Sequence, residues 1–199
     1  VPSNPAGIAA GDVDGDGDVD AVVTRHNGNA VAVLVRDGPT GIVAGANIPT
    51  GANPVGVRLA RVNGDNHLDM VVAHYGAASV GVYLGDGSGG FSAPALLATP
   101  YRPHTLEVVD LDGDGFLDIA VANEGSASLS VFQGNGDGTF GARTDLPAGN
   151  NPYVLAADLD GDGRPDLAAG NHGSNTVGFW RHQGDGTFAS MIPLAGGLA

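Results

Sequence analysis

Hydrophobic residues occur along the chain in short runs that alternate with polar or small residues, and Gly-rich segments separate the runs. Between residues 100 and 148 the runs are TLEVV (105–109), LDIAVA (117–122), SLSVFQ (128–133) and FGARTDL (140–146), with the turn GNGDGT between the last two. Alternation and β-branched residues are typical of strands, and Asn-Gly and Asp-Gly pairs are typical of hairpin turns. No run has the spacing of an amphipathic helix, so the pattern predicts an all-β protein.

The same pattern occurs four times. Pro5, Pro54, Pro103 and Pro152 follow one another at intervals of 49 residues, with corresponding turns and strands between them. Four short strands repeated at this period are the signature of a β-propeller blade, whose faces must be covered by neighbouring blades. We therefore expect a single β-propeller domain, residues 1–199, of four blades that are each a four-stranded antiparallel sheet. The expected blade limits are about 1–50, 51–99, 100–148 and 149–199.

The presence of four blades does not determine whether the propeller closes into a ring. We expect a closed, monomeric ring, because both ends of the chain fall at repeat boundaries. A pairing of two chains, or a longer array of which these four repeats are part, are the alternatives.

Acidic residues are concentrated in one loop of each repeat. The chain has 22 acidic residues and 8 arginines, no lysine, and a formal charge of −14. Fifteen of the 22 acids lie in loop one (12–20), loop two (61–69), loop three (110–118) and loop four (158–166). The negative charge of the chain disfavours nucleic acid and anionic lipid as partners, because both are themselves negatively charged. The longest apolar runs, such as AVAVLV at 30–35, are too short for membrane insertion.

Loops one, three and four follow the pattern D-x-D-x-D-G-x-x-D, which matches the first half of an EF-hand loop. Carboxylates at positions 1, 3, 5 and 9 and the carbonyl at position 7 are oxygen ligands, which calcium prefers, and no cysteine is present to form a thiolate site. Plain Asp-Gly turns are the alternative. The three predicted calcium sites comprise Asp12, Asp14, Asp16, Asp18 and Asp20; Asp110, Asp112, Asp114, Phe116 and Asp118; and Asp158, Asp160, Asp162, Arg164 and Asp166.

Loop two departs from this pattern, because Arg61 takes position 1 and Asn66 replaces the glycine at position 6. One interpretation is a fourth calcium site. Its ligands are then Asn63, Asp65, His67 and Asp69. In the other interpretation, Arg61 pairs with Asp65 and Asp69 and takes the place of the ion.

A second set of residues could bind a ligand. If the first strand of each blade is innermost, the turns after the second strands and the links between blades share the end of the propeller opposite the acidic loops. Tyr and His side chains there could stack on a sugar face, while Asn and Arg could bond its hydroxyl groups. The candidate residues are His26, His74, Tyr75, Arg102, His104, Glu124, Tyr153 and His172. Ordinary solvated turns are the alternative, and a transition-metal site formed by three of the histidines is another.

The whole chain resembles the FG-GAP/VCBS repeats, which form the calcium-loop blades of integrin α-subunits and of many exported bacterial proteins. The aspartates of loops one, three and four carry this resemblance, as do the turns FSAP (91–94) and FGAR (140–143). The chain is also similar to fungal lectins of the Psathyrella velutina type. The resemblance implies a propeller with calcium between the first and second strands of a blade. It also implies an extracellular or cell-surface location, with a glycan or an extracellular protein as the partner.

Catalysis is not expected, because the chain has no G-x-S-x-G or H-E-x-x-H motif and no cysteine nucleophile. Glu107 and Glu124 are the only glutamates, and nothing pairs either of them with a second catalytic carboxylate. The sequence thus predicts a calcium-binding, non-catalytic binding module, lectin-like in its partner class. A structural module of a larger exported protein and a polysaccharide-acting enzyme are the alternatives.

Overall fold

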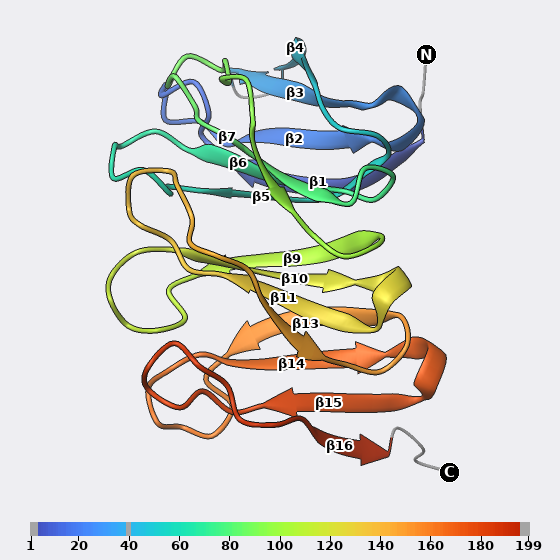
Figure 1. Ribbon diagram of the computed structural model, residues 1–199. Helices are drawn as coiled ribbons and strands as arrows, with labels where there is room; N and C mark the ends of the chain where they lie inside the picture. The colour runs from blue at the N-terminus through green and yellow to red at the C-terminus, as the bar shows by residue number, and fades with distance from the viewer. Residues whose placement is uncertain (1–3, 39–40, 196–199) are drawn as a thin grey trace. The chain divides into compact units, whose positions relative to one another are not determined.

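The computed structural model describes residues 4–38 and 41–195, which form four sheets of four antiparallel strands (Figure 1). In every sheet the strands lie in their order along the chain. The first blade has β1 (Pro5–Gly11), β2 (Asp20–Arg25), β3 (Ala30–Asp37) and β4 (Gly41–Pro49), and the second has β5 (Pro54–Ala60), β6 (Asp69–His74), β7 (Ser79–Tyr83) and β8 (Ala95–Ala98). The third has β9 (Pro103–Val109), β10 (Asp118–Asn123), β11 (Ser128–Phe132) and β12 (Thr144–Pro147), and the fourth has β13 (Pro152–Ala157), β14 (Asp166–Asn171), β15 (Thr176–Trp180) and β16 (Ile192–Ala195).

These sheets confirm the predicted all-β class and its four four-stranded antiparallel blades. Each acidic loop lies between the first and second strands of its blade, as expected. Short 3₁₀ turns join the second and third strands in three blades, at η1 (His26–Gly28), η2 (Glu124–Ser126) and η3 (His172–Ser174). No helix of the described residues is long and apolar enough to cross a membrane.

One strand differs from its predicted range. The fourth strand of the third blade begins at Thr144, whereas the hydrophobic pattern predicts a start at residue 140. Phe140 instead forms an isolated bridge with Gly134, which closes the Gly-rich turn. The apolar residue at 140 therefore belongs to the turn, and the chain crosses residues 141–143 before it joins the sheet.

The chain divides into two compact units, Val1–Ala98 and Thr99–Ala199, with two blades in each. The interpretation of residues 1–199 as a single domain stays a prediction, and the outermost residues, 1–3 and 196–199, lie outside the described part of the chain.

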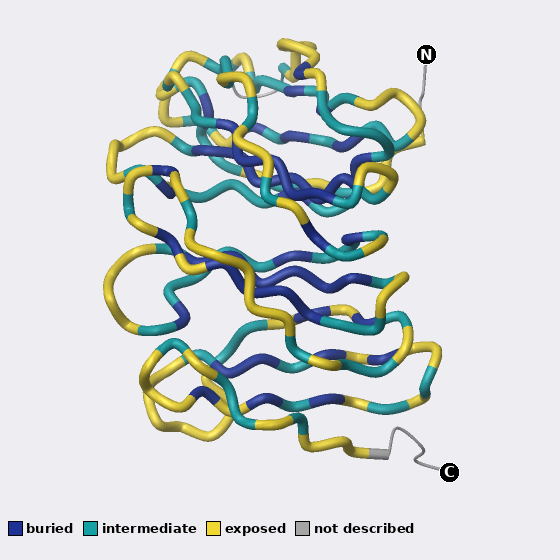
Figure 2. The backbone as a smooth tube through the Cα atoms, in the orientation of Figure 1, coloured by how far each residue is buried: buried dark blue, intermediate teal, exposed yellow. Residues whose placement is uncertain are grey.

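Within each unit the two blades share one hydrophobic core. In the first unit, Val22 and Val33 of the first blade pack with Met70 and Tyr83 of the second, and each is at most 1% exposed. Burying a side chain of this size contributes about 1.5–3 kcal/mol relative to leaving it in water. Figure 2 shows the buried positions in the strands and the exposed positions mainly in the turns.

The second unit has a corresponding core, in which Leu111 and Leu129 of the third blade pack with Leu167 and Trp180 of the fourth. All four side chains are at most 1% exposed. Pairs of blades are therefore held together by apolar burial, which leaves the loops and turns at the blade ends to carry polar side chains.

Backbone contacts also join the blades within each unit. In the first unit, the Thr24 hydroxyl accepts a hydrogen bond from Gly7 N and donates one to Val55 O at 2.9 Å. A Cβ atom at Gly7 would clash with that same Val55 oxygen, so the close approach of the first strands requires glycine there. In the second unit, Val154 N donates to the Thr105 hydroxyl at 3.0 Å.

Candidate metal centres and ligand surface

The aspartate at position 9 of every acidic loop braces the backbone. Its Oδ2 atom accepts a backbone N–H from the start of its own loop at 2.7–3.1 Å. Its Oδ1 atom accepts a second N–H from a residue at the end of the third strand or just after it, at 2.8–2.9 Å. The four aspartates, each at most 3% exposed, are Asp20, Asp69, Asp118 and Asp166. Each therefore fixes its loop to its sheet whether or not an ion is bound.

We call these four position 9 aspartates braces, and burial affects the protonation of two of them. It raises the pKa of Asp69 and of Asp118, while the two backbone N–H groups on each carboxylate oppose that rise. For Asp118, the negative charges of Asp112 and Asp114 add to the increase. A cation held beside the carboxylate would relieve both the burial cost and the repulsion.

The aspartate at position 1 shapes the loop in three of the four copies. Asp12, Asp110 and Asp158 each accept the N–H groups of positions 4 and 6 at 2.7–3.0 Å. The position 6 glycines have φ angles of 89–90°, a left-handed conformation that favours glycine. These bonds curl the loop so that position 1 faces positions 3 and 9.

The curl brings three carboxylates together in loops one, three and four. One oxygen from each of positions 1, 3 and 9 lies within 4.8 Å of the others. The three groups are Asp12, Asp14 and Asp20; Asp110, Asp112 and Asp118; and Asp158, Asp160 and Asp166. Their donor atoms are all carboxylate oxygens, which suit calcium rather than a soft metal, so the residues fit the ion that the sequence predicts.

Repulsion within these groups is visible at Asp14. Desolvation raises the pKa of this carboxyl most, and the neighbouring Asp20, Asp16 and Asp12 raise it further. The hydrogen bond that Asp14 accepts from Asp16 N acts in the opposite direction.

The three groups do not include the carboxylates at position 5, and the carbonyls at position 7 stay predicted ligands. The carboxylates at position 5, Asp16, Asp114 and Asp162, instead accept the N–H of position 7 at 2.8–3.0 Å. The residues at position 7 are Asp18, Phe116 and Arg164, whose carbonyls were the predicted ligands. Phe116 is 45% exposed, and Asp18 forms an ion pair with Arg36 at 3.3 Å.

Loop two has no such group, although all its residues are described. The Arg61 guanidinium donates to Asn66 O at 3.0 Å, and Asn63 donates to the Asp65 carboxylate at 2.8 Å. Asp65 also accepts the N–H of His67, and that bond lowers its pKa most, with smaller contributions from Asn63, His67 and Arg61. Loop two therefore satisfies the Asp65 carboxylate with hydrogen bonds from its own residues, while Arg61 bonds to a backbone carbonyl.

The candidate ligand residues form contacts between adjacent blades. In the first unit, the rings of His26 and Tyr75 lie 6.1 Å apart. In the second unit, His104 and Tyr153 make an edge contact at 5.0 Å between ring centres. Tyr153 is 47% exposed and shares a hollow of about 490 Å³ with His172, Asn171 and Val177. That hollow combines an aromatic face with polar side chains.

Arg102 and Glu124 lie close together in the same unit. Glu124 N donates to Arg102 O at 2.8 Å, and the Arg102 guanidinium lies 4.9 Å from the centre of the Tyr101 ring. Arg102 has a φ angle of 59°, in the left-handed region, where the other three repeats have asparagine. A bulky side chain in that conformation is strained.

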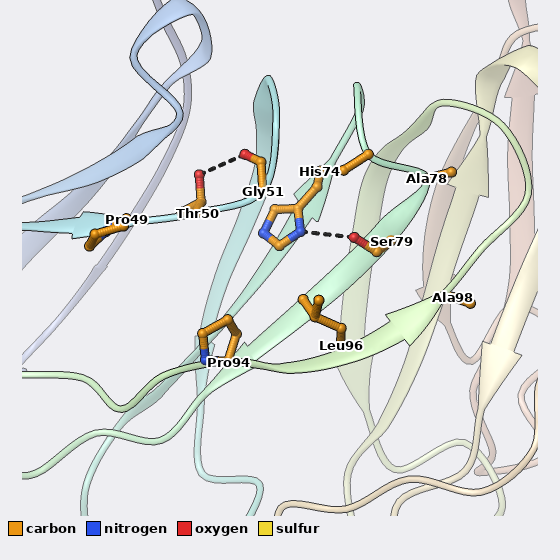
Figure 3. Close-up of a pocket in the computed structure, with 10 residues that line it drawn as sticks. Pro49, Thr50, Gly51, His74, Ala78, Ser79, Pro94, Leu96 and Ala98 are labelled. Carbon is orange, nitrogen blue, oxygen red and sulfur yellow. Dashed lines mark hydrogen bonds between the residues drawn. The ribbon is translucent and has the colours of Figure 1, made fainter.

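His74 differs from the other candidates, because it is fully buried. Figure 3 shows its ring beside Ser79, to which it is hydrogen-bonded. Its Nδ1 atom lies 3.0 Å from the Ser79 hydroxyl and its Nε2 atom 3.1 Å from the Tyr83 hydroxyl. Burial lowers the pKa of His74 to about 4 and raises that of Tyr83. The ring forms part of the wall of a hollow of about 600 Å³ whose other lining residues include Leu96 and Pro94.

The contact between His74 and Ser79 has counterparts in other blades. Asn123 donates to the Ser128 hydroxyl at 3.2 Å, and Asn171 donates to the Thr176 hydroxyl, also at 3.2 Å. These pairs lie at the same place, where the second strand turns into the third. The histidine–serine pair is therefore a hairpin contact of the fold, not a nucleophile with its base.

Sequence reasoning missed two features of these sites. It treated the position 9 aspartates only as ligands, although their presence in loop two, which lacks the carboxylates at positions 1 and 3, indicates a structural role. It also missed the side chains that reach loops three and four from the third strands, Gln133 and Arg181. The presence of the position 9 aspartate in all four copies could have revealed its role, whereas no local signal indicates the contacts of Gln133 and Arg181.

Comparisons with known proteins agree with this architecture. A family model described as an FG-GAP-like repeat matches residues 12–72, 61–121, 110–169 and 158–198, and each match begins at the first residue of an acidic loop. This match confirms the resemblance that the sequence indicates. No curated protein matches the chain.

Solved structures that share the fold include the following three. A lectin of Agrocybe aegerita, described as specifically recognising non-reducing terminal N-acetylglucosamine, has 24% identity and a TM-score of 0.60, over 92% of this chain and 50% of its own. A functionally unknown protein of Desulfotomaculum acetoxidans has 17% identity and a TM-score of 0.68, over 96% and 58%. A candidate 6-phosphogluconolactonase of Bacteroides uniformis has 15% identity and a TM-score of 0.71, over 96% and 55%. The chain spans little more than half the length of these proteins.

Proposed function

Because the chain belongs to the FG-GAP-like repeat family and gathers three carboxylates in each of three loops, we propose that it is a calcium-stabilised, non-catalytic module that binds carbohydrate. The observation that carries the proposal is the grouping of Asp110, Asp112 and Asp118, with its equivalents in loops one and four. Loop two, which lacks this grouping, holds no ion.

Calcium has a structural task in this proposal. A bound ion supplies positive charge at the point where three carboxylates meet. The position 1 carboxylate keeps the loop curled through its two N–H bonds, and the position 9 carboxylate ties the site to the sheet. Ion binding is therefore coupled to folding. Extracellular calcium would fill such loops even at affinities of about 10⁻⁴–10⁻³ M, which supports an extracellular location.

The carbohydrate site is the hollow beside Tyr153. An exposed aromatic ring offers an apolar face for a sugar, while His172 and Asn175 offer polar groups at its edge. The hollow near His74 is less suitable, because its lining is mostly aliphatic and the Thr50 hydroxyl already donates to Gly51 O (Figure 3). The Agrocybe aegerita lectin makes N-acetylglucosamine the first sugar to test.

The hydrogen-bond partners of the polar side chains support a binding role rather than an enzymatic one. The buried histidine–hydroxyl pair His74 and Ser79 is replaced by amide–hydroxyl pairs at the same position in two other blades. The carboxylates at position 1 of the acidic loops accept backbone N–H groups of their own loops, which gives them a structural role in the loop.

The test has two parts, a glycan-array screen of calcium-loaded protein and a calorimetric titration with N-acetylglucosamine. Both are carried out on the wild-type protein and on the Tyr153→Ala and Tyr101→Ala variants. Tyr101 is the matched control, because it is an exposed tyrosine outside the hollow. We expect a sugar preference that Tyr153→Ala reduces at least tenfold and Tyr101→Ala leaves within about twofold. Absence of binding to every glycan would contradict the carbohydrate proposal and make an extracellular protein the partner class to test next.

A further inference from the structure

In the third and fourth blades, a side chain from the end of the third strand reaches the acidic loop of the same blade. Leu34, Tyr83, Phe132 and Trp180 pair with the residue that follows the position 9 aspartate. The residues one step further along the chain occupy equivalent places in the four blades. They are Val35, Leu84, Gln133 and Arg181.

These four residues differ in the contacts that they make with the position 3 side chain of their loops. In the fourth blade, the Arg181 guanidinium forms an ion pair with Asp160 and approaches Asp162 at 4.0 Å. In the third blade, the Gln133 amide donates to Asp112 at 3.1 Å. The first blade has the aliphatic Val35 at this place, so Asp14 meets no charge or donor from it.

A second arginine adds positive charge at loop four. Arg164 at position 7 lines the same hollow of about 410 Å³ as Arg181, together with Asp162. Loop three has the neutral Phe116 at that position, and loop one has Asp18, whose charge Arg36 balances. Loop four therefore sets two arginines against four aspartates, whereas loop three has four aspartates and no arginine.

We propose that Arg181 is a built-in counter-cation of loop four, which makes this loop the weakest of the three calcium sites and the last to fill. The inference rests on the proposed calcium function and adds an order to the sites. Loops one and three fill first, because the residues equivalent to Arg181 in their blades, Val35 and Gln133, carry no charge.

The difference in affinity is limited by the exposure of Arg181. Its side chain is 58% exposed, and it borders a solvent-filled hollow into which it can turn. An exposed ion pair contributes little, so its loss does not forbid ion binding. The repulsion between an arginine and a divalent ion a few ångström apart remains, and we expect an affinity about tenfold lower than at loops one and three.

The test is calorimetric calcium titration of chelator-treated protein, with Arg181→Gln, which copies the third blade, and the reciprocal Gln133→Arg. Arg143→Gln is the matched control, because it removes the same charge from a residue that pairs with Asp145 outside the acidic loops. A thermal melt of each variant in calcium checks that it is folded.

We expect the wild-type protein to bind two ions tightly and a third about tenfold more weakly. Arg181→Gln should bring the third affinity to within about threefold of the others, Gln133→Arg should weaken a second site, and Arg143→Gln should change nothing. Three equal affinities in the wild-type protein, or a third affinity that Arg181→Gln leaves unchanged, would overturn this inference while calcium binding stands. Absence of any ion uptake would overturn the proposed function and this inference together.

Discussion

The second and third blades have the same strand order and the same brace, yet only one of them gathers carboxylates. Asp69 and Asp118 accept equivalent pairs of backbone N–H groups at 2.7–2.9 Å. Loop three adds Asp110 and Asp112 within 4.8 Å of the brace, whereas loop two has Arg61 and Asn63 at those positions. One aspartate is enough to fix the loop to the sheet, and three are needed before the loop becomes a candidate ion site.

The same two blades differ at the other end, where the second strand turns into the third. The second blade buries His74 between two hydroxyl groups, and the third buries Asn123 against Ser128 and Ser130. Both side chains bridge the hairpin, but only the histidine titrates in the range of ordinary buffers. The comparison therefore predicts that calcium controls the stability of the third blade and that pH controls that of the second.

Removal of calcium should have the largest effect. At a free calcium concentration of 100 times the dissociation constant, each occupied site stabilises the folded protein by about 2.7 kcal/mol. For three such sites, excess EDTA should therefore lower the free energy of unfolding by about 8 kcal/mol, measured by denaturant titration. Asp112→Asn in loop three should reduce this EDTA effect by about a third, whereas Asp65→Asn in loop two should leave it unchanged. Equal effects of the two variants would break the distinction between the loops.

Acid should destabilise the second blade through His74. Burial lowers the pKa of His74 to about 4 from an unfolded value near 6.5. The folded state then binds fewer protons than the unfolded state between these values, so the stability present above pH 6.5 is lost as pH falls towards 4. The loss should reach about 3 kcal/mol.

His74→Asn, which copies the third blade, should remove this pH dependence. The measurement is the free energy of unfolding at several pH values in the presence of chelator, for the wild-type protein and the variant. Parallel pH profiles for the two proteins would show that His74 does not titrate as its burial requires.

Loss of a brace should cost about 2 kcal/mol in either blade. Asp69→Asn and Asp118→Asn each replace one accepting oxygen by an amide that cannot accept a backbone N–H, and a buried donor without a partner costs about 1–3 kcal/mol. Denaturant titration in EDTA should show similar losses for the two variants. In calcium, Asp118→Asn should lose additional stability because it also removes a ligand. A brace variant that is neutral in EDTA would contradict the structural role.

The smallest effect concerns the links before the two blades. Asn53 and Arg102 hold the left-handed conformation at equivalent positions, with φ angles of 52° and 59°. Asparagine tolerates this region better than arginine, so Arg102→Asn should raise the free energy of unfolding by about 0.5–1 kcal/mol. The reverse change, Asn53→Arg, should lower it by a similar amount. Destabilisation by Arg102→Asn would show that the contacts of the arginine outweigh its strain.

Much of this architecture could be predicted from the sequence, because its signals repeat. The proline interval and the strand runs indicate the blades, and the substitutions at Arg61 and Asn66 mark loop two as different. Repetition also locates the acidic loops between first and second strands, where the structure has them. These features depend on local sequence patterns, which can be recognised in the sequence without the structure.

The remaining features depend on which way a side chain points. His74 occurs in a polar turn segment in the sequence, yet the hairpin directs its ring inward to Ser79 and Tyr83. The carboxylates at position 5 match the ligand pattern, but they bond to the loop's own backbone and not to the groups at positions 1, 3 and 9. Arg181 lies 21 residues from Asp160 in the chain, so no local motif reveals their ion pair.

Counting the calcium ions bound per chain tests the central claim most directly. Native mass spectrometry of chelator-treated protein, after calcium is returned in millimolar excess, gives this number without an assumption about affinity. We predict three ions, held by loops one, three and four. A chain that takes up none, or one that takes up four, would contradict the claim that three carboxylates at positions 1, 3 and 9 separate an ion site from a braced turn.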